Sequence, residues 1–359
     1  MEPIKEALTF DDVLLVPQFS SVVPSNTNIN TNLSNTIHLK IPFISSAMDT
    51  VTESKMAIAM AKNGGLGVIH RNLEIKKQCG EIKKVKNNRY KVGAAIGTSK
   101  TELKRAKNLI DSGTDMIVID TAHGHSNNVL KMLNQIKKFS KNMTICVGNI
   151  ATGEAAKLLY NSGADILKVG IGPGSICTTR MVAGIGVPQI TALLNVKKAM
   201  NKKKVKIISD GGIKFSGDII KAIAAGADAI MMGSIFAGTE ESPGKTFKFK
   251  NKTYKIYRGM GSIGAMSSGS SERYFQKNFK DKSKFVPEGV ESRVLFKGKV
   301  AKIIYQLQGG LRSSMGYIGA QKLQEVNKKS KFIKITKAGF YESMVHSVEK
   351  IKSTTNYKL

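Results

Sequence analysis

Met116-Ile-Val-Ile-Asp120 opens the stretch that decides the fold. A helical pattern over Asn127–Phe139 follows it, then Thr144-Ile-Cys-Val-Gly148, a second helical pattern over Glu154–Asn161, and finally Ile166-Leu-Lys-Val169. Short, continuous apolar runs are typical of parallel strands that helices cover on both faces. The regular alternation of such runs with helical patterns therefore predicts consecutive β-α-β units.

The same alternation extends to both sides of this stretch. Five more strands are predicted at Ile41–Asp49, Leu66–His70, Val92–Ile96, Lys206–Ser209 and Ala229–Met232. The helical patterns between them cover Glu53–Asn63, a lysine-rich run up to about Asn88, Lys100–Ser112, Pro188–Met200 and Ser216–Ala225. Eight strand–helix units favour a closed (β/α)8 barrel, the TIM barrel, over an open sheet. We therefore predict a single α/β domain over residues 1–359.

The segment that follows the eighth strand departs from this rhythm. Residues 241–298 are polar and rich in Gly and Ser, and the next helical pattern comes only near Val300–Gln308. A long segment without regular structure in a compact domain usually serves as a lid or another functional loop. We predict that residues 241–298, called the flap below, form a mobile, irregular insertion that binds substrate. Residues 1–40 also read as irregular, with a few apolar anchors.

Composition narrows the classes of protein that the chain can belong to. The net charge of +30 raises the alternative of a basic nucleic-acid-binding barrel protein. Most of that charge is lysine spread along the whole chain, and aromatic residues, on which single-stranded nucleic acids stack, make up only 6% of it. We therefore do not expect a nucleic acid to be required, and an anionic small substrate explains part of the charge.

Cysteine content and hydropathy indicate the compartment. Cys79, Cys146 and Cys177 are too few for a disulfide framework, which favours a reducing cytoplasm. No stretch approaches the roughly 20 apolar residues of a membrane span, and the first residues lack the pattern of a signal peptide. We expect a cytoplasmic protein without a membrane contact.

Polar residues and glycines follow the predicted strands at the point where each strand ends. Asp120, Asn149 and Asp210 stand there, and the pairs Gly211-Gly212 and Gly233-Ser234 end the seventh and eighth strands. The active site of a TIM barrel lies at this rim, and phosphate often binds beside the last two strands. Asp210 is placed to accept hydrogen bonds from a ribose diol, although a turn or helix-cap role is the alternative.

Lys168-Val-Gly-Ile-Gly-Pro-Gly-Ser-Ile-Cys-Thr-Thr-Arg180 is the most unusual loop on this rim. Glycines let backbone groups approach a ligand closely. The thiol of Cys177 stands among hydroxyls and near a cation, which is a setting for a nucleophile. The alternative for this loop alone is a tight turn with an incidental cysteine.

Taken together, the motifs closely resemble the IMP dehydrogenase family. The resemblance runs over nearly the whole chain. Its markers are Ala7–Leu15, Ser46–Thr52, Asp120–His125, Gly170–Arg180, Asp210–Gly212, Tyr257–Gly261, Ser271–Phe275, Val286–Gly289 and Glu342–His346.

This resemblance implies oxidation of IMP to XMP with NAD+ and water, a step of guanine nucleotide biosynthesis. Cys177 would attack C2 of the purine, a hydride would leave, and the covalent adduct would be hydrolysed. Arg273 resembles the family's general base for the water, with Tyr274 beside it on the flap, and Thr179 resembles the threonine that helps to activate the water.

The resemblance also implies a set of binding residues. The IMP phosphate would bind Ser175, Gly212, Gly233, Ser234 and Tyr257, and the ribose diol would bind Asp210. The rest of the substrate site would comprise Ser46, Met48, Asn149, Gly211, Arg258, Gly259, Met260, Gly261 and Glu288. The cofactor would contact Asp120, Gly170, Ile171 and Gly172.

A potassium ion is implied as well, bound by carbonyl oxygens. Gly172, Gly174 and Cys177 would supply three of them, and the other ligands would be Glu342, Ser343 and Met344 of a neighbouring subunit. Carbonyl ligation suits a large monovalent ion. Such sharing between subunits implies a homotetramer.

The chain departs from the family pattern at two places. Family members usually carry a pair of cystathionine-β-synthase (CBS) modules between the second helix and the third strand, whereas Tyr90 here runs directly into Lys91. Leu295-Phe296 replaces a common Pro-Tyr pair near the flap. The nearest rival within the fold is GMP reductase, which deaminates its substrate reductively. Arg273-Tyr274 together with Pro287-Glu288-Gly289 favours the dehydrogenase.

Overall fold

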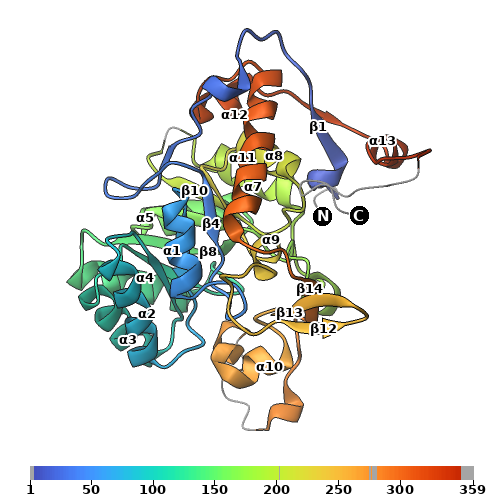
Figure 1. The fold of residues 1–359 in the computed structure, drawn as a ribbon. Coiled ribbons are helices and arrows are strands. Elements are labelled where there is room, and N and C mark those ends of the chain that lie inside the picture. The colour runs from blue at the N-terminus through green and yellow to red at the C-terminus, as the bar shows by residue number, and fades with distance from the viewer. Residues whose placement is uncertain (1–3, 202, 275, 277–280, 349–359) are drawn as a thin grey trace.

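The computed structural model describes residues 4–201, 203–274, 276 and 281–348. Eight parallel strands close into a barrel in the order β10-β11-β4-β5-β6-β7-β8-β9 (Figure 1). Their bounds are β4 Phe43–Ser45, β5 Leu66–Ile69, β6 Gly93–Ile96, β7 Met116–Asp120, β8 Thr144–Ile150, β9 Ile166–Val169, β10 Lys206–Asp210 and β11 Ala229–Met232. The predicted (β/α)8 barrel is confirmed, and each predicted strand lies where the sequence indicated.

Helices surround this barrel and alternate with its strands. The bounds are α1 Ser54–Lys62, α2 Ile75–Asn87, α3 Lys100–Asp111, α4 Asn127–Phe139, α5 Gly153–Asn161, α7 Gln189–Ala199, α8 Ser216–Ala224 and α11 Val300–Tyr317. Shorter helices are α6 Thr179–Val182, α9 Ser234–Ala237, α10 Ile263–Ala265, α12 Val326–Lys329 and α13 Lys337–Glu342. None of the helices in the described ranges is long and apolar enough to span a membrane.

The inside of the barrel changes from apolar to polar along the strands. Alternate side chains of each strand point inward. The apolar inner layer includes Val118, Ile166 and Ile208. Two residues further along the same strands stand Asp120, Lys168 and Asp210, so these three share the inward direction at the C-terminal rim. Charged groups therefore line the C-terminal rim, and the apolar inner layer fills the barrel beneath them.

A hairpin of the N-terminal segment closes the opposite end of the barrel. Strands β2 (Thr31–Asn32) and β3 (His38–Leu39) pair antiparallel. Leu33, Ile37 and Leu39 of this hairpin pack into the inner apolar cluster of the barrel. The expectation that residues 1–40 are irregular is wrong here, because two-residue strands leave too short a pattern to detect.

The two ends of the described chain meet in a second small sheet. Strand β1 (Val13–Leu15) pairs antiparallel with β15 (Phe332–Lys334), and Leu14 lies opposite Ile333. Neither strand was predicted, since each has only three residues and its partner lies at the other end of the sequence. This pairing fixes the N-terminal segment to the chain that follows α11.

The flap contains more regular structure than its composition suggested. Strands β12 (Phe247–Phe249), β13 (Lys252–Arg258) and β14 (Glu291–Leu295) form an antiparallel sheet that extends away from the barrel (Figure 1). The prediction of an irregular segment is wrong for these residues. Apolar side chains alternate with lysines over residues 247–250, and Lys250 and Asn251 adopt the positive φ values of a tight hairpin turn. That alternation is a strand signal that the Gly and Ser content obscured.

Helix α11 is longer than the pattern near Val300–Gln308 indicated, since it ends at Tyr317. Gly309 and Gly310 interrupt the pattern, yet Leu311 and Met315 continue the buried face beyond them. A Cβ on Gly310 would lie 2.2 Å from Oγ of Ser216, the first residue of α8. Gly310 therefore allows close helix packing rather than ending the helix.

Alanine substitutions at the two adjacent glycines are expected to have opposite effects on stability. A Cβ at Gly309 meets no atom within 4 Å, so Gly309→Ala should raise the free energy of unfolding by about 1 kcal/mol through helix propensity. Gly310→Ala should lower it by about 1–3 kcal/mol because Ser216 must shift. Urea unfolding followed by circular dichroism measures both values. Equal stabilisation by the two substitutions would contradict the close packing.

Candidate active site

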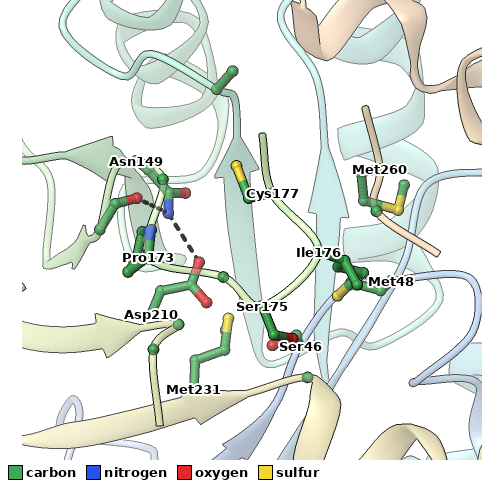
Figure 2. Close-up of a pocket in the computed structure, with 18 of the residues that line it drawn as sticks. Ser46, Met48, Asn149, Pro173, Ser175, Ile176, Cys177, Asp210, Met231 and Met260 are labelled. Atoms are coloured by element: carbon green, nitrogen blue, oxygen red, sulfur yellow. Dashed lines mark hydrogen bonds between the residues drawn. The ribbon is translucent and has the colours of Figure 1, made fainter. Parts of the chain in front are cut away.

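A cavity opens at the C-terminal ends of the barrel strands, as expected for this fold. Most of the site residues predicted from the sequence line it. They are Ser46, Met48, Asp120, Asn149, Gly170, Ile171, Gly172, Gly174, Ser175, Cys177, Thr179, Asp210, Gly211, Gly212, Gly233, Ser234, Tyr257, Gly259, Met260, Arg273, Tyr274 and Glu288. Figure 2 shows several of them facing one another across this space.

Five predicted residues are not among those that line the cavity. Arg258 instead pairs with Asp49, with 2.7 Å between Nη2 and Oδ2. Gly261 lies behind Tyr274, and a Cβ there would be 2.7 Å from the Cζ of that ring. The other three residues are Glu342, Ser343 and Met344. They lie near the C-terminal end of α13 and do not line this cavity.

The cysteine loop is held by its own glycines and by the flap. Gly172 has a φ of 75° and cannot be replaced without strain. The Sγ of Cys177 lies 3.1 Å from the Oγ1 of Thr179. The backbone N–H of Thr178 donates to the carbonyl of Glu288 at 2.9 Å. The far part of the flap therefore fixes the loop that presents the thiol, which the sequence did not reveal.

The opposite wall of the cavity is built for an anionic group. Gly211 and Gly212 have φ values of 91° and 83° and form a tight turn that brings the backbone of Gly212 to this wall, while the N–H of Gly211 donates to the carbonyl of Met231. Tyr257 is 4% exposed. Burial raises the pKa of its phenol above the ordinary range, although a hydrogen bond with Ser175 partly opposes that rise. Tyr257 is therefore a neutral hydrogen-bond donor at this wall.

Lys168 is the charged centre of the site, a role that the sequence did not reveal. Its side chain is 2% exposed, and its Nζ lies 2.9 Å from Oδ1 of Asp120 and 2.8 Å from Oδ2 of Asp210. It also donates to the side-chain carbonyl of Asn149. Asn149 in turn donates to Asp210 at 2.9 Å, the bond drawn in Figure 2. Lys168 thus joins two carboxylates from different strands.

The protonation state of this cluster follows from its burial and its charges. Burial alone would lower the pKa of Lys168, but Asp120 and Asp210 outweigh it and raise that pKa above the ordinary value. Burial likewise opposes ionisation of Asp120, yet Arg273 and Lys168 hold the pKa of its carboxyl well below the usual range. The sequence did contain a signal for this cluster: a lysine stands inside the apolar run Ile166–Val169. A charge buried in such a strand requires a partner of opposite charge.

Arg273 brings the flap into the cavity. Its guanidinium forms an ion pair with Asp120. Its carbonyl accepts a hydrogen bond of 3.2 Å from the backbone N–H of Ala122. Burial lowers the pKa of Arg273, but Asp120 outweighs that effect and raises it. In this conformation Arg273 is therefore a cation bound to the carboxylate that the sequence analysis assigned to the cofactor.

The fold and this cavity define a (β/α)8-barrel enzyme with a candidate cysteine nucleophile on a glycine loop. Residues 7–346 match the family model described as the IMP dehydrogenase / GMP reductase domain. The chain belongs to this family.

Curated relatives that carry the name inosine-5'-monophosphate dehydrogenase are similar to almost the whole chain. The protein of Cryptosporidium parvum is 48% identical over 397 residues, which covers 99% of this chain and 98% of the relative. That of Borreliella burgdorferi is 46% identical over 394 residues, covering 96% and 98%. That of Aquifex aeolicus is 40% identical over 483 residues, covering 99% and 98%. All three alignments are longer than this chain, so part of each relative has no counterpart among the 359 residues here, and that part is largest for the last one.

Replacement of the buried lysine is expected to destabilise the barrel strongly. Lys168→Met removes the ammonium between the buried carboxylate of Asp120 and the partly buried carboxylate of Asp210, and should lower the free energy of unfolding by about 3–5 kcal/mol. Lys206→Met is the matched control, because Lys206 is 37% exposed and pairs with a single carboxylate, that of Asp228. Lys206→Met should lower the free energy of unfolding by at most about 1 kcal/mol. Similar urea-unfolding results for the two variants would refute the central role of Lys168.

Proposed function

We propose that the protein oxidises IMP to XMP with NAD+ and water, a step of guanine nucleotide biosynthesis. One observation carries the proposal: a thiol, a polar wall for a nucleotide and a flap cation converge on a single cavity of a chain from this family. The names of the curated relatives support the same reaction.

The substrate lies between the cysteine loop and the last two strands. The ribose diol hydrogen-bonds to Asp210, whose carboxylate is already oriented by Lys168 and Asn149. The phosphate binds the backbone N–H groups of Gly212, Gly233 and Ser234, with Tyr257 and Ser175 as hydroxyl donors. These contacts support an anionic nucleotide because the glycine turns present N–H groups without side chains in the way.

The chemistry begins at Cys177. Its Sγ gives up its proton to solvent and attacks C2 of the hypoxanthine, and the hydrogen at C2 leaves with its electron pair. NAD+, when bound, supplies the acceptor for this hydride. Water then adds to C2, the C2–Sγ bond breaks, and XMP leaves while the thiol is restored. Covalent catalysis of this kind divides one difficult step into two easier steps.

The cofactor subsite consists of Asp120 and the turn Gly170–Gly172. The Asp120 carboxylate suits the hydroxyls of the nicotinamide ribose, and the glycines let the backbone of this turn lie close to the carboxamide. In the conformation described, the same carboxylate accepts Arg273 of the flap. The flap and the cofactor therefore use the same group at different stages, so the flap closes only after NADH has left.

The closed flap supports hydrolysis of the adduct. Arg273, Tyr274 and Thr179 all line the cavity that contains Cys177. Arg273, a cation in the conformation described, orients the attacking water as the C2–O bond forms, with Tyr274 beside it, and the proton that the water loses restores the thiol of Cys177. The flap comprises residues 241–298, is mobile between these two stages, and belongs to a single catalytic domain that carries no CBS pair.

A potassium ion and a homotetramer complete the proposal. The carbonyl of Gly174 accepts a bond from the N–H of Cys177, which leaves a lone pair for an ion. The turn thus fits an ion held by the carbonyls of Gly172, Gly174 and Cys177. Glu342, Ser343 and Met344 of a neighbouring subunit supply the other ligands. Free thiols at Cys79, Cys146 and Cys177 support a cytoplasmic location.

An absorbance assay for NADH tests the reaction. With IMP and NAD+ the protein should produce NADH and XMP, and it should not consume NADPH when GMP is supplied. Cys177→Ala should reduce NADH production by at least about 10³-fold because the nucleophile is lost. Cys79→Ala, which removes a thiol from helix α2, is the control and should retain activity. Consumption of NADPH with GMP alone would instead indicate the reductase.

Removal of the flap cation should separate the two halves of the reaction. Arg273→Ala should still form NADH in a first turnover but hydrolyse the adduct about 10²–10⁴-fold more slowly. Intact-mass analysis after addition of IMP and NAD+ should then show a covalent adduct on the chain. Arg293→Ala is the matched control, since Arg293 lies in β14 of the same flap and stacks on Phe249 at 3.6 Å. Absence of the adduct in Arg273→Ala would contradict this role of Arg273.

A further inference from the structure

Glu272, the residue before Arg273, attaches the flap to the barrel. It lies in the single turn Ser271–Tyr274. Its Oε1 accepts hydrogen bonds from the backbone N–H groups of Thr98 at 2.9 Å and Ser99 at 2.6 Å. Ser99 is the N-cap of α3, so the carboxylate also interacts favourably with the positive end of a helix of 12 residues.

The receptor for this carboxylate is preorganised on the barrel. Arg71, which is 8% exposed, lies with its Nη1 3.7 Å from Oε2 of Glu272 and 4.0 Å from Oε2 of Glu102. Glu102 in turn accepts from the N–H of Gly97 at 2.6 Å and from Nε of Arg105 at 2.9 Å. The receptor groups therefore hold one another in place without the flap.

The space for Glu272 depends on the absence of a side chain at Gly97. A Cβ there would lie 2.4 Å from Nη1 of Arg71 and 2.8 Å from Oε1 of Glu272. The charge of the Glu272 carboxyl also suits this space. Burial opposes ionisation of Glu272, but Arg71 and the two backbone amides outweigh it and lower the pKa of its carboxyl. The flap thus places an ionised group into a site shaped to receive it.

Glu272 does not line the cavity, so it acts on the reaction only through its neighbours. Arg273 is held from three directions: by the carboxylate anchor one residue before it, by the bond from Ala122 to its own carbonyl, and by Asp120 at its guanidinium. Only Asp120 is assigned to the cofactor. The Glu272 anchor can therefore favour the closed flap without occupying the cofactor subsite.

We propose that Glu272 is a positioning residue that docks the flap on Arg71 and the N-terminus of α3, and so sets how often Arg273 reaches the adduct. This inference rests on the proposed function. The anchor stabilises the hydrolytic conformation, whereas hydride transfer requires the flap to be away from Asp120. Loss of the anchor should therefore slow hydrolysis and leave the first NADH turnover intact.

Stopped-flow and steady-state measurements on Glu272→Ala test this separation. The rate of the first NADH turnover should stay within about twofold of that of the unaltered protein. Adduct hydrolysis should slow by about 10-fold or more, as expected for loss of charge-assisted bonds. The apparent KM for NAD+ should fall, because more of the protein has Asp120 free of Arg273. Glu272→Asp, which keeps the charge, should recover part of the hydrolysis rate.

Glu291→Gln is the matched control. Glu291 lies in β14 of the flap and accepts a bond of 2.8 Å from the N–H of Gly264, which is also in the flap. Among the described residues this hydrogen bond of Glu291 stays within the flap, so hydrolysis in Glu291→Gln should stay near that of the unaltered protein. In the double variant Glu272→Ala/Arg273→Ala, hydrolysis should be no slower than in Arg273→Ala alone, since Glu272 acts through Arg273. An equal loss in Glu291→Gln, or an additive loss in the double variant, would overturn the proposal.

Hydrogen exchange tests the anchor independently of the chemistry. The peptide that contains Thr98 and Ser99 should exchange faster in Glu272→Ala than in the unaltered protein, because both amides lose their acceptor. Unchanged exchange of that peptide would refute the anchor. The exchange measurement does not depend on turnover. If the protein made no NADH from IMP, the proposed function would be refuted, and hydrogen exchange alone would still test the anchor.

Discussion

A lysine ammonium buried at the rim of the barrel is the interaction on which the site depends. Closure of the barrel turns the inward positions of β7, β9 and β10 toward one axis, so Asp120, Lys168 and Asp210 must meet. The carboxylates of Asp120 and Asp210 would repel each other without a cation between them. The Lys168 ammonium alone would lose its hydration on burial without gaining a partner. Together they satisfy one another, which makes the cluster stable only as a set.

That cluster also determines how ligands are shared. Asp210 faces the proposed substrate and Asp120 faces the proposed cofactor, while Lys168 holds both. Arg273 of the flap competes for Asp120. Lys168 occupies Oδ1 of Asp120 and Arg273 lies at Oδ2, so under the proposed function the cofactor and the flap would compete for this second oxygen, with the cofactor first and the flap second. The anchor at Glu272 does not use Asp120, so it can shift the balance between the cofactor and the flap without occupying the carboxylate itself.

The sequence predicted the barrel well because its strands are buried on both faces. Runs such as Ile166–Val169 carry enough apolar residues to identify a strand without knowledge of its neighbours. The β2–β3 hairpin and the β1–β15 pair escaped prediction because strands of two or three residues gain their stability from distant partners. Strands β12–β14 were obscured by the Gly and Ser that surround them.

The sequence by itself determined which residue types stand at the strand ends and in the cysteine loop, and hence the family. Local pattern suffices for this because rim position follows directly from strand position. The role of Lys168 and the docking of Glu272 on Thr98 and Ser99 were decided only by the tertiary structure. Both depend on groups that are far apart along the chain and meet only after the barrel has closed and the flap has folded back over it.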